Sequence, residues 1–429
     1  MREMKDSGVE WIGVIPNDWT INQVRRHYYN VKRIAGDSAD EYERLALTLK
    51  GVIKRSKEDN EGLQPEKFEG YQILKENELV FKMIDLENVN TSRVGLSTYT
   101  GLVSPAYIVL SNDSNDNRYA YYWFMSMYYQ EIFNKLGGDG VRSALNVKDM
   151  LSLPIPNISL NQQKNIADYL DAKCSLIDSI IAKQEAIIEK LKEYKFSVIT
   201  EAVTKGLNPN VEVKDSGVKW IGYIPKSWAI VKGHRIIQST QNGLTRRDLE
   251  KSEGDIVLKL KNITEDGEIS YKEVNRVLLS DNERETYLLK NGDFLFVRVN
   301  GSKNLVGKSA VFESIGENVA YNDHIIRVRL NRLCNQKFLK YYLISTSGKY
   351  EIETHTITSA GQYTISGDGL RDLFICLPPI EEQKKIIEFL DNKITMIDER
   401  IESFKRLICS LQDYRKSLIY EVVTGKKEV

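Results

Sequence analysis

Cysteine is scarce in this chain of 429 residues, and its few copies stand far apart. No two cysteines have the CxxC spacing of zinc sites and redox motifs, and their wide separation argues against a disulfide framework. Histidine is equally scarce, and no two histidines have a spacing that would place both on one face of a helix. The sequence therefore predicts no metal site, and we expect packing or surface roles for these residues. They are Cys174, Cys334, Cys376, Cys409, His27, His234, His324 and His355.

Long apolar runs are also missing. The first residues, MREMKDSGVEWIG, contain no apolar stretch like that of a secretion signal, and no run elsewhere is long enough to span a bilayer. Lys plus Arg and Asp plus Glu both number 60, so the chain as a whole is not a polycation that would attract nucleic acid or an anionic membrane. We therefore expect a cytoplasmic protein of two or three domains, in which any nucleic-acid contact depends on local patches.

What the chain does contain is an internal repeat. The segment KDSGVEWIGVIPNDW at residues 5–19 returns as KDSGVKWIGYIPKSW at residues 214–228, with eleven of fifteen positions identical. A second repeat lies further along, where residues 161–204 align without a gap on residues 381–424. Two repeats in the same order indicate a tandem duplication.

Both copies of the second repeat have apolar residues at alternating spacings of three and four, which is the heptad pattern of coiled coils. Neither copy contains Gly or Pro, so each predicts one continuous helix of about 60 Å. Because so long a helix with a narrow apolar stripe needs a partner, we expect the two to pair as an antiparallel coiled coil. The alternative is that each helix packs only on its own domain. The residues expected in the seam are Ile177, Ile181, Ile188, Leu191, Ile397, Ile401, Ile408 and Leu411.

Two poorly matched stretches, residues 20–152 and 229–372, separate these repeats. Their local patterns are nevertheless alike. LKENELVFKM, which begins at Leu74, resembles LKNGDFLFVR, which begins at Leu289, and each predicts a turn that enters a short strand. SPAYIVLS and NDHIIRVRL, further along, also predict strands, and a short helical stretch follows each.

The predicted fold class is α+β, with two α+β domains that are each followed by a long helix. We place the boundaries at residues 1–152 for the N-terminal segment and first domain, 153–209 for the first helix, 210–372 for the linker segment and second domain, and 373–429 for the second helix.

The paired Trp-Ile-Gly segments, together with the leads LPIPNISLNQQKNIADYLD and LPPIEEQKKIIEFLD into the long helices, resemble the specificity subunit of type I restriction-modification systems. The resemblance covers essentially the full chain. It implies that each α+β domain is a target recognition domain for one half of a bipartite double-stranded DNA sequence. It also implies that the helices form a spacer and bind two copies of the modification (methyltransferase) subunit, that a restriction subunit joins the full complex, and that the chain has neither catalytic residues nor a cofactor.

The residues alone leave other functions open. Two similar domains on a rigid helix pair suit a long ligand with approximate twofold symmetry, and duplex DNA is the leading candidate. A coiled-coil adaptor whose two domains bind proteins is the alternative. A self-sufficient methyltransferase is disfavoured because the Asn/Asp-Pro-Pro-aromatic tetrapeptide is missing, and GSKNLVGKS at residues 301–309 lacks the spacing of a nucleotide-binding P-loop.

Specific DNA readout uses Arg, Lys, Asn and Gln on base edges. Neither domain is basic overall, since Lys and Arg number 17 against 18 Asp and Glu in residues 20–152, and 21 against 19 in residues 229–372. Polar or Gly-rich loops must therefore supply the contacts, although each such residue is equally compatible with an ordinary solvated loop. The candidates are Arg93, Arg142, Asn146, Arg246, Arg247, Lys303, Asn304, Lys308, Gln362 and Tyr363.

The large residues of the first repeat have a different expected role. A cluster of Trp, Ile and Pro is suited to fix the entry of a domain against the helices, so we expect structural anchors rather than DNA contacts. These residues are Trp11, Ile15, Pro16, Trp19, Trp220, Ile224, Pro225 and Trp228.

Overall fold

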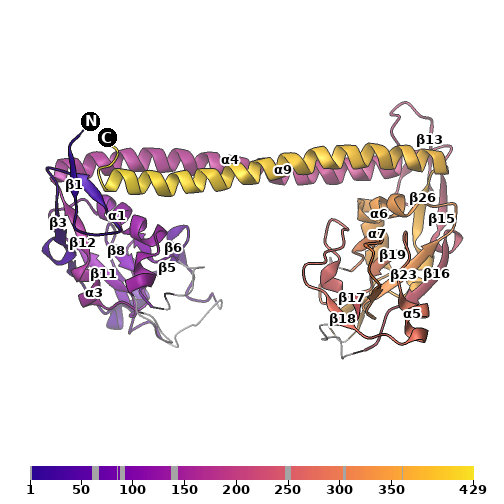
Figure 1. The fold of residues 1–429 in the computed structure, drawn as a ribbon, viewed down its shortest axis with the longest axis horizontal. Helices are drawn as coiled ribbons and strands as arrows, with labels where there is room; N and C mark the ends of the chain where they lie inside the picture. The colour runs from indigo at the N-terminus through magenta and orange to yellow at the C-terminus, as the bar shows by residue number, and fades with distance from the viewer. Residues whose placement is uncertain are drawn as a thin grey trace. The chain divides into compact units, whose positions relative to one another are not determined.

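The computed structural model describes residues 2–59, 67–84, 86, 92–136, 144–246, 253–302, 306–359 and 361–429. The chain forms two compact units. Unit 1 contains Met1–Glu185 and Lys405–Val429, and unit 2 contains Ala186–Phe404. Each unit therefore combines an α+β domain with a part of both long helices (Figure 1).

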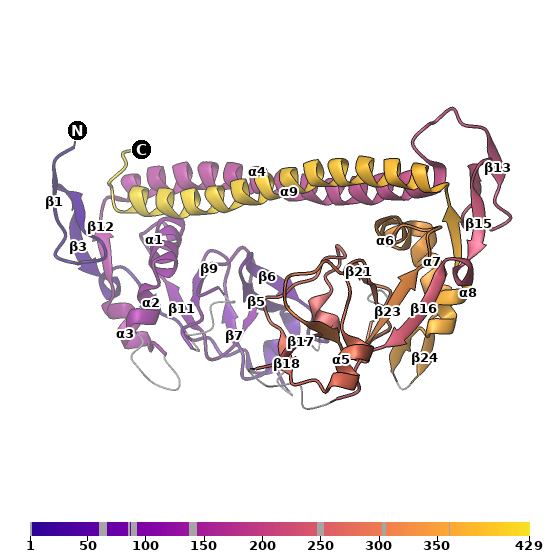
Figure 2. The same ribbon diagram turned by 45° about the vertical axis from the view of Figure 1, so that its right-hand side comes forward.

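The two long helices are α4 (Leu160–Lys205) and α9 (Ile380–Val423), and both are uninterrupted. In unit 1 the start of α4 packs against the end of α9, and in unit 2 the end of α4 packs against the start of α9 (Figure 2). The helices are therefore antiparallel, and the predicted coiled coil is confirmed. All eight predicted seam residues are buried or half-buried, with Ile177 at 5% exposure and Ile401 at 6% as examples.

The Trp-Ile-Gly segments form equivalent hairpins in the two units. In unit 1, β1 (Met4–Asp6) pairs with β2 (Val14–Pro16), and in unit 2, β13 (Val213–Asp215) pairs with β14 (Tyr223–Pro225) in the same register. The indoles of Trp19 and Trp228 are 2% and 1% exposed. This burial confirms that the segments are structural anchors.

A glycine after each long helix makes room for the buried indole of its unit. A Cβ atom on Gly206 would lie 3.2 Å from Cζ2 of Trp228, and one on Gly425 would lie 3.0 Å from Cη2 of Trp19. Both glycines have a positive φ, +79° and +71°, which ends the helix in a conformation that other residues rarely adopt. The helix ends and the anchors are therefore fitted to each other.

Unit 1 contains two four-stranded sheets, with strand orders β6-β5-β10-β7 and β4-β11-β8-β9, and a two-stranded sheet of β3 and β12. The strands are β3 (Thr20–Gln23), β4 (Tyr29–Asn30), β5 (Arg44–Thr48), β6 (Gly51–Arg55), β7 (Gln72–Leu74), β8 (Leu79–Phe81), β9 (Val94–Leu96), β10 (Gly101–Val103), β11 (Ile108–Ser111) and β12 (Pro154–Asn157). The helices are α1 (Asn117–Tyr129), α2 (Ile132–Leu136) and α3 (Val147–Ser152).

Unit 2 contains a four-stranded sheet, β16-β23-β19-β21, two three-stranded sheets, β18-β17-β22 and β20-β25-β24, and the pair β15-β26. The strands are β15 (Ala229–Lys232), β16 (Ile237–Asn242), β17 (Asp255–Leu258), β18 (Asn275–Val277), β19 (Phe294–Val297), β20 (Val299–Asn300), β21 (Ser309–Val311), β22 (Val319–Tyr321), β23 (Ile325–Leu330), β24 (Ile357–Ser359), β25 (Gln362–Thr364) and β26 (Phe374–Leu377). The helices are α5 (Asp281–Tyr287), α6 (Gln336–Ile344), α7 (Thr346–Thr354) and α8 (Gly367–Asp372).

The strands that the sequence predicted are present as β8, β11, β19 and β23. The helical stretch after β11 divides into α1 and α2, because Glu131 between them has a positive φ of 56°. The predicted α+β fold with a tandem duplication is confirmed.

The duplication also appears in the contacts between each domain and the long helices. In unit 1, Tyr122 of α1 donates its hydroxyl to Asp171 of α4 at 2.7 Å. In unit 2, Tyr341 of α6 donates to Asp391 of α9 at 2.5 Å. Each tyrosine thus ties the main helix of a domain to the long helix that follows that domain in the sequence. None of the helices in the described part of the chain is long and apolar enough to cross a membrane.

Candidate nucleic-acid interface

Four strand ends meet at one edge of the main sheet of unit 2. Val297 at the end of β19 pairs with Ile325 at the start of β23, and Asn242 at the end of β16 pairs with Ile326. On the other side, Phe296 pairs with Ser309 at the start of β21. The residues just beyond these strand ends therefore lie next to one another. We call them the unit 2 edge, and they are residues 243–246, 298–300, 308 and 322–324.

A glycine permits the close packing of this edge. A Cβ atom on Gly243 would lie 2.3 Å from the carbonyl oxygens of both Tyr321 and Asn322. The neighbouring backbone is hydrogen-bonded on both sides, because Leu244 N donates to Tyr321 O and Asp323 N donates to Leu244 O. No larger residue fits at position 243 without a shift of the backbone, so this close packing requires glycine.

Of the ten predicted DNA contacts, Arg246 and Lys308 lie at the unit 2 edge. Lys308 has 19% of its side chain exposed and lies 3.7 Å from the carboxylate of Glu265. It lines a cavity of about 700 Å³ together with Lys349, whose ammonium lies 4.7 Å from the ring centroid of Phe196. Glu265 and Glu353 line the same cavity, so the two lysines are balanced by two carboxylates.

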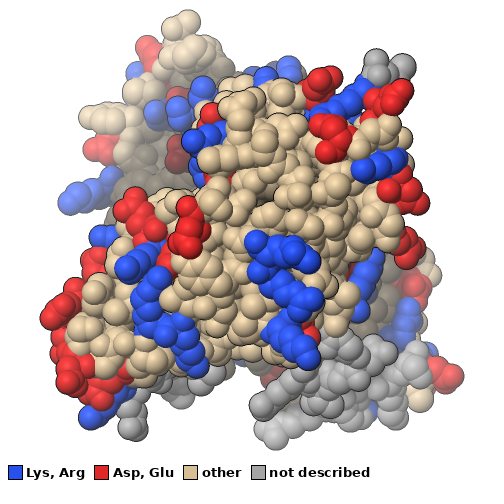
Figure 3. Space-filling model, turned by 90° about the vertical axis from the view of Figure 1, so that its left-hand side faces the viewer, with Lys and Arg blue, Asp and Glu red and all other residues tan. Residues whose placement is uncertain are grey.

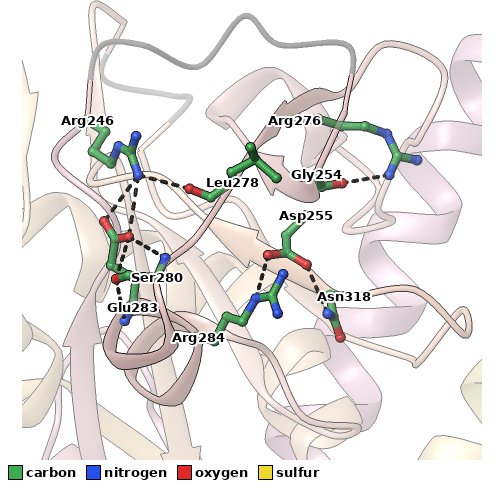
Figure 4. Close-up of polar contacts among 9 residues, drawn as sticks. All are labelled: Arg246, Gly254, Asp255, Arg276, Leu278, Ser280, Glu283, Arg284 and Asn318. Atoms are coloured by element: carbon green, nitrogen blue, oxygen red, sulfur yellow. Dashed lines mark hydrogen bonds and ion pairs between the residues drawn. The ribbon is translucent and has the colours of Figure 1, made fainter.

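Arg246 is held by an acidic residue at the start of α5 (Figure 4). Its Nη1 lies 3.4 Å from both carboxylate oxygens of Glu283 and donates to Leu278 O at 3.3 Å. Glu283 in turn accepts hydrogen bonds from the amide and hydroxyl of Ser280, which lower the pKa of its carboxyl group. Arg246 is therefore paired within the fold, and a DNA contact would require it to exchange Glu283 for a phosphate or a base.

The same view shows a second acid that organises this region. Asp255, at the start of β17, is 6% exposed. Its two carboxylate oxygens accept from Arg284 Nε at 3.0 Å and from Asn318 Nδ2 at 2.9 Å (Figure 4). The start of β17 is thereby fixed to α5, which also carries the partner of Arg246.

Gln362 and Tyr363 lie on β25, which pairs with β20 at the unit 2 edge. Tyr363 pairs with Asn300 of β20, and Ile365 N donates to Arg298 O at 2.9 Å. Gln362 is exposed, whereas Tyr363 is half-buried against the core of unit 2. Tyr363 therefore lies beside the unit 2 edge through Asn300, and Gln362 is its neighbour on the same strand.

The candidates of unit 1 lie differently. Arg93, just before β9, is only 1% exposed, and its Nη1 donates to Ile84 O at 2.9 Å. In this position Arg93 supports the start of β9 from inside the fold. Its guanidinium is not exposed, and its contact with DNA stays a prediction. Asn146 is exposed and caps α3, since its Oδ1 accepts from Asp149 N at 3.1 Å. The candidates Arg142, Arg247, Lys303 and Asn304 lie outside the described residues.

Charge on the side of the molecule that Figure 3 presents is divided into small groups. Lys and Arg side chains gather in short clusters, with Asp and Glu near the margins and uncharged residues between them (Figure 3). This pattern agrees with the balanced charge count of the sequence. Within the described ranges, no group of three or more His, Cys, Asp or Glu side chains is placed to hold a metal ion.

Three polar residues of the unit 2 edge are not among the predicted DNA contacts. They directly flank core strands, at the end of LKNGDFLFVR and at the start of NDHIIRVRL. Both stretches were recognised as strands, and the polar residues at their ends are the signal that was available. The three are Arg298, Asn322 and His324.

A tandem pair of α+β units that share an antiparallel helix pair defines the class of this protein as a duplicated two-domain fold. The family model of the type I restriction modification DNA specificity domain matches residues 50–193 and 229–403. These two regions make up most of the chain, and the protein belongs to this family.

Similar proteins support this assignment. The type I restriction enzyme StySPI specificity subunit of Salmonella potsdam is 28% identical over 316 residues, which cover 72% of this chain and 65% of that protein. The EcoKI specificity subunit of Escherichia coli (strain K12) is 24% identical over 335 residues, or 76% and 68% of the two chains. The match thus spans about two thirds of the length of these relatives.

A solved structure from a study of complex assembly and conformational transition of the type I R-M system has a similar fold. Its TM-score is 0.70 at 12% sequence identity, and the match covers 96% of this chain and 99% of that one. At this level of identity the likeness shows the fold.

Proposed function

We propose that this protein is the DNA-recognition and scaffold subunit of a type I restriction-modification complex. One observation carries the proposal: the family model of the DNA specificity domain matches the chain twice, once chiefly in each unit. A chain with two specificity domains suits a bipartite target, in which each domain reads one half-site of duplex DNA. The relatives StySPI and EcoKI are named as specificity subunits, which agrees with this role.

In this proposal the parts of the chain have separate tasks. Residues 1–152 and 210–372 contain the two target recognition domains, and the spacer consists of residues 153–209 and 373–429. The outer surface of the spacer binds two copies of the modification subunit, and a restriction subunit joins the full complex in the cytoplasm. The chain itself is non-catalytic and acts by position, because it places the modification subunits over their target bases.

The contacts of unit 2 suggest how a recognition domain takes up DNA. Lys308 and Arg246 are each paired with a carboxylate, Glu265 and Glu283, at 3.7 Å and 3.4 Å. Because these pairs are partly exposed, each contributes little to stability, and a phosphate can replace the carboxylate at little free-energy cost. We therefore assign the predicted residues Arg246, Lys308, Gln362 and Tyr363 to the DNA-facing region of unit 2.

The test is to co-express the chain with its modification subunit and to map adenine methylation on genomic DNA by single-molecule sequencing. The expected result is one bipartite motif with a fixed gap between its half-sites. The modification subunit expressed without this chain is the control, and it should give no such motif. A stable complex that methylates no bipartite motif would contradict the proposal and favour the adaptor alternative.

A further inference from the structure

Three neighbouring side chains at the unit 2 edge have buried polar atoms to which no described residue supplies a hydrogen-bond partner. The atoms are Arg298 Nε, Asn322 Oδ1 and His324 Nδ1. Nearly all buried polar atoms in native proteins have a partner, because an unpartnered one has lost its bond to water. Three such atoms on adjacent residues mark this edge as a place where a water or a ligand would supply the missing partner.

The backbone holds these three residues together. Arg298 N donates to His324 O at 2.9 Å, and Arg298 Nη1 donates to Asp323 O at 3.5 Å. Within the turn before β23, Ile325 N donates to Asn322 O at 3.0 Å. The end of β19 and the start of β23 are thus tied, so Arg298 stands against the turn that carries Asn322 and His324.

Further backbone contacts hold Asn322 against β17 and the end of β16. Asn322 N donates to Leu258 O at 2.9 Å, and the backbone of Leu244 forms a bridge with Asn322. Gly243 permits this approach, as described above. A site whose backbone is fixed on several sides needs little reorganisation when a ligand binds, which favours selective recognition.

The kinds of polar atom identify the ligand. Arg298 offers donors, Asn322 offers an acceptor and a donor, and a phosphate supplies acceptors only. Base edges in the major groove supply both: Arg pairs with guanine O6 and N7, and Asn pairs with adenine N6 and N7. Asp323 has 39% of its side chain exposed beside them, and its carboxylate repels a phosphate but accepts from the amino group of cytosine.

We propose that Arg298, Asn322 and His324 form a base-reading site that specifies the half-site bound by unit 2. All three side chains are partly exposed, His324 to 39%, so a base edge can meet their exposed atoms, and the three buried atoms become available when the side chains turn outward. The inference rests on the proposed function and names the residues that carry part of its specificity. The competing explanation is an ordered water, which would satisfy the same atoms without reading any sequence.

The experiment compares Asn322→Ala, His324→Ala and Arg298→Met with the wild-type chain in the complex with its modification subunit. Genomic methylation is mapped, and each half-site is scored separately. We expect each variant to relax the base preference at one or two positions of a single half-site and to lower methylation of the original motif roughly tenfold or more. The other half-site and the gap should be unchanged, so every variant contains its own internal control.

Asn282→Ala is the matched control, because Asn282 is exposed on α5 in the same unit. It should retain the wild-type motif and rate. A variant that fails to fold would lose methylation of the whole motif. In that case the conservative change His324→Gln is used, and it should shift the preferred base and keep the complex intact.

The proposed function and the base-reading site fail in different ways. If the wild type methylates no bipartite motif, the proposed function itself is wrong. If the wild type gives a bipartite motif and the folded variants keep the same base preference and rate, only the base-reading site is overturned, and an ordered water is the better explanation.

Discussion

Trp220 donates its indole Nε1–H to Oε1 of Glu351 at 2.7 Å. Glu351 is 0% exposed, and its second oxygen accepts from Phe374 N at 3.0 Å. One buried carboxylate therefore joins the repeated Trp-Ile-Gly segment, helix α7 and strand β26 of unit 2. The Trp-Ile-Gly segment of unit 2 is thus hydrogen-bonded to its domain through a residue 131 positions further along the chain.

Glu351→Ala should destabilise unit 2. The change leaves two donors, Trp220 Nε1 and Phe374 N, without their acceptor inside the protein, and each such loss costs about 1 to 3 kcal/mol. We expect the free energy of unfolding to fall by roughly 2 to 6 kcal/mol, measured by urea denaturation of the full chain. Glu388→Ala, at an exposed position of α9, is the control and should change stability little. A loss for Glu351→Ala no larger than the control's would show that the carboxylate is dispensable.

A polar contact interrupts the apolar seam of the long helices in each unit. In unit 2, Lys195 Nζ lies 2.8 Å from both carboxylate oxygens of Asp398. In unit 1, the equivalent residues in the repeat, Arg415 and Asp178, form an ion pair at 3.3 Å. Here the basic residue is on α9 and the acidic residue on α4, the reverse of the pair in unit 2. Arg415 also donates to Tyr129 Oη at 2.7 Å, so it joins the seam to α1.

The double variant Lys195→Met, Asp398→Leu should lose less stability than the sum of the losses in the two single variants. Lys195→Met leaves Asp398 without its partner, and Asp398→Leu leaves Lys195 with only the more distant carboxylate of Asp266 at 3.8 Å, whereas the double change leaves an apolar pair. Because Asp398 remains 48% exposed, we expect a coupling energy of only about 1 kcal/mol. Thermal denaturation of the four chains in a double-mutant cycle measures it. Additive effects would mean that the pair is fully screened by water.

The gap between the half-sites should depend on the length of the long helices. We predict that four extra residues in α4 after Gln184, together with four in α9 after Phe404, add about 6 Å to the spacer. This length corresponds to one or two base pairs, so the methylated motif should gain one or two base pairs in its gap and keep both half-sites. An unchanged gap in a folded, active complex would remove the idea that the helices act as a ruler.

Thiol reactivity should distinguish one cysteine from the other three. Cys409 is exposed on α9, whereas Cys174, Cys334 and Cys376 are buried. Burial raises the pKa of Cys334 and of Cys376 to about 12 and also raises that of Cys174, so these thiols hardly ionise near neutral pH. A chromogenic disulfide reagent at pH 8 should modify about one thiol in the native chain and all four in denaturant. Cys409→Ser is the control, and rapid reaction of a further thiol in that variant would contradict the burial.

The duplication, the coiled coil and the anchors could all be predicted because each depends on a pattern within a short segment. The heptad spacing around Ile177 and Ile397 defines a helix stripe before any fold is known. Strands β8 and β19 were predicted for the same reason, since a turn followed by a few apolar residues is a local signal. These elements agree with the structure because tertiary packing reinforces what the local sequence favours.

The candidate interface could be predicted only in part. Arg246 and Lys308 were chosen as charged loop residues, but their pairing with Glu283 and Glu265 depends on chain segments far away in the sequence. Arg93 was chosen on the same grounds, and the fold places its guanidinium inside. Residue type and loop position do not reveal burial, because burial depends on which distant segments cover a loop.

The sequence by itself determined that the protein is a duplicated pair of α+β domains with two long paired helices, since periodicity and repetition are properties of the chain. Only the tertiary structure decided which polar residues share one surface. Arg298 and Asn322 became neighbours because β19 pairs with β23 in one register, and a register is set by the packing of a whole sheet face.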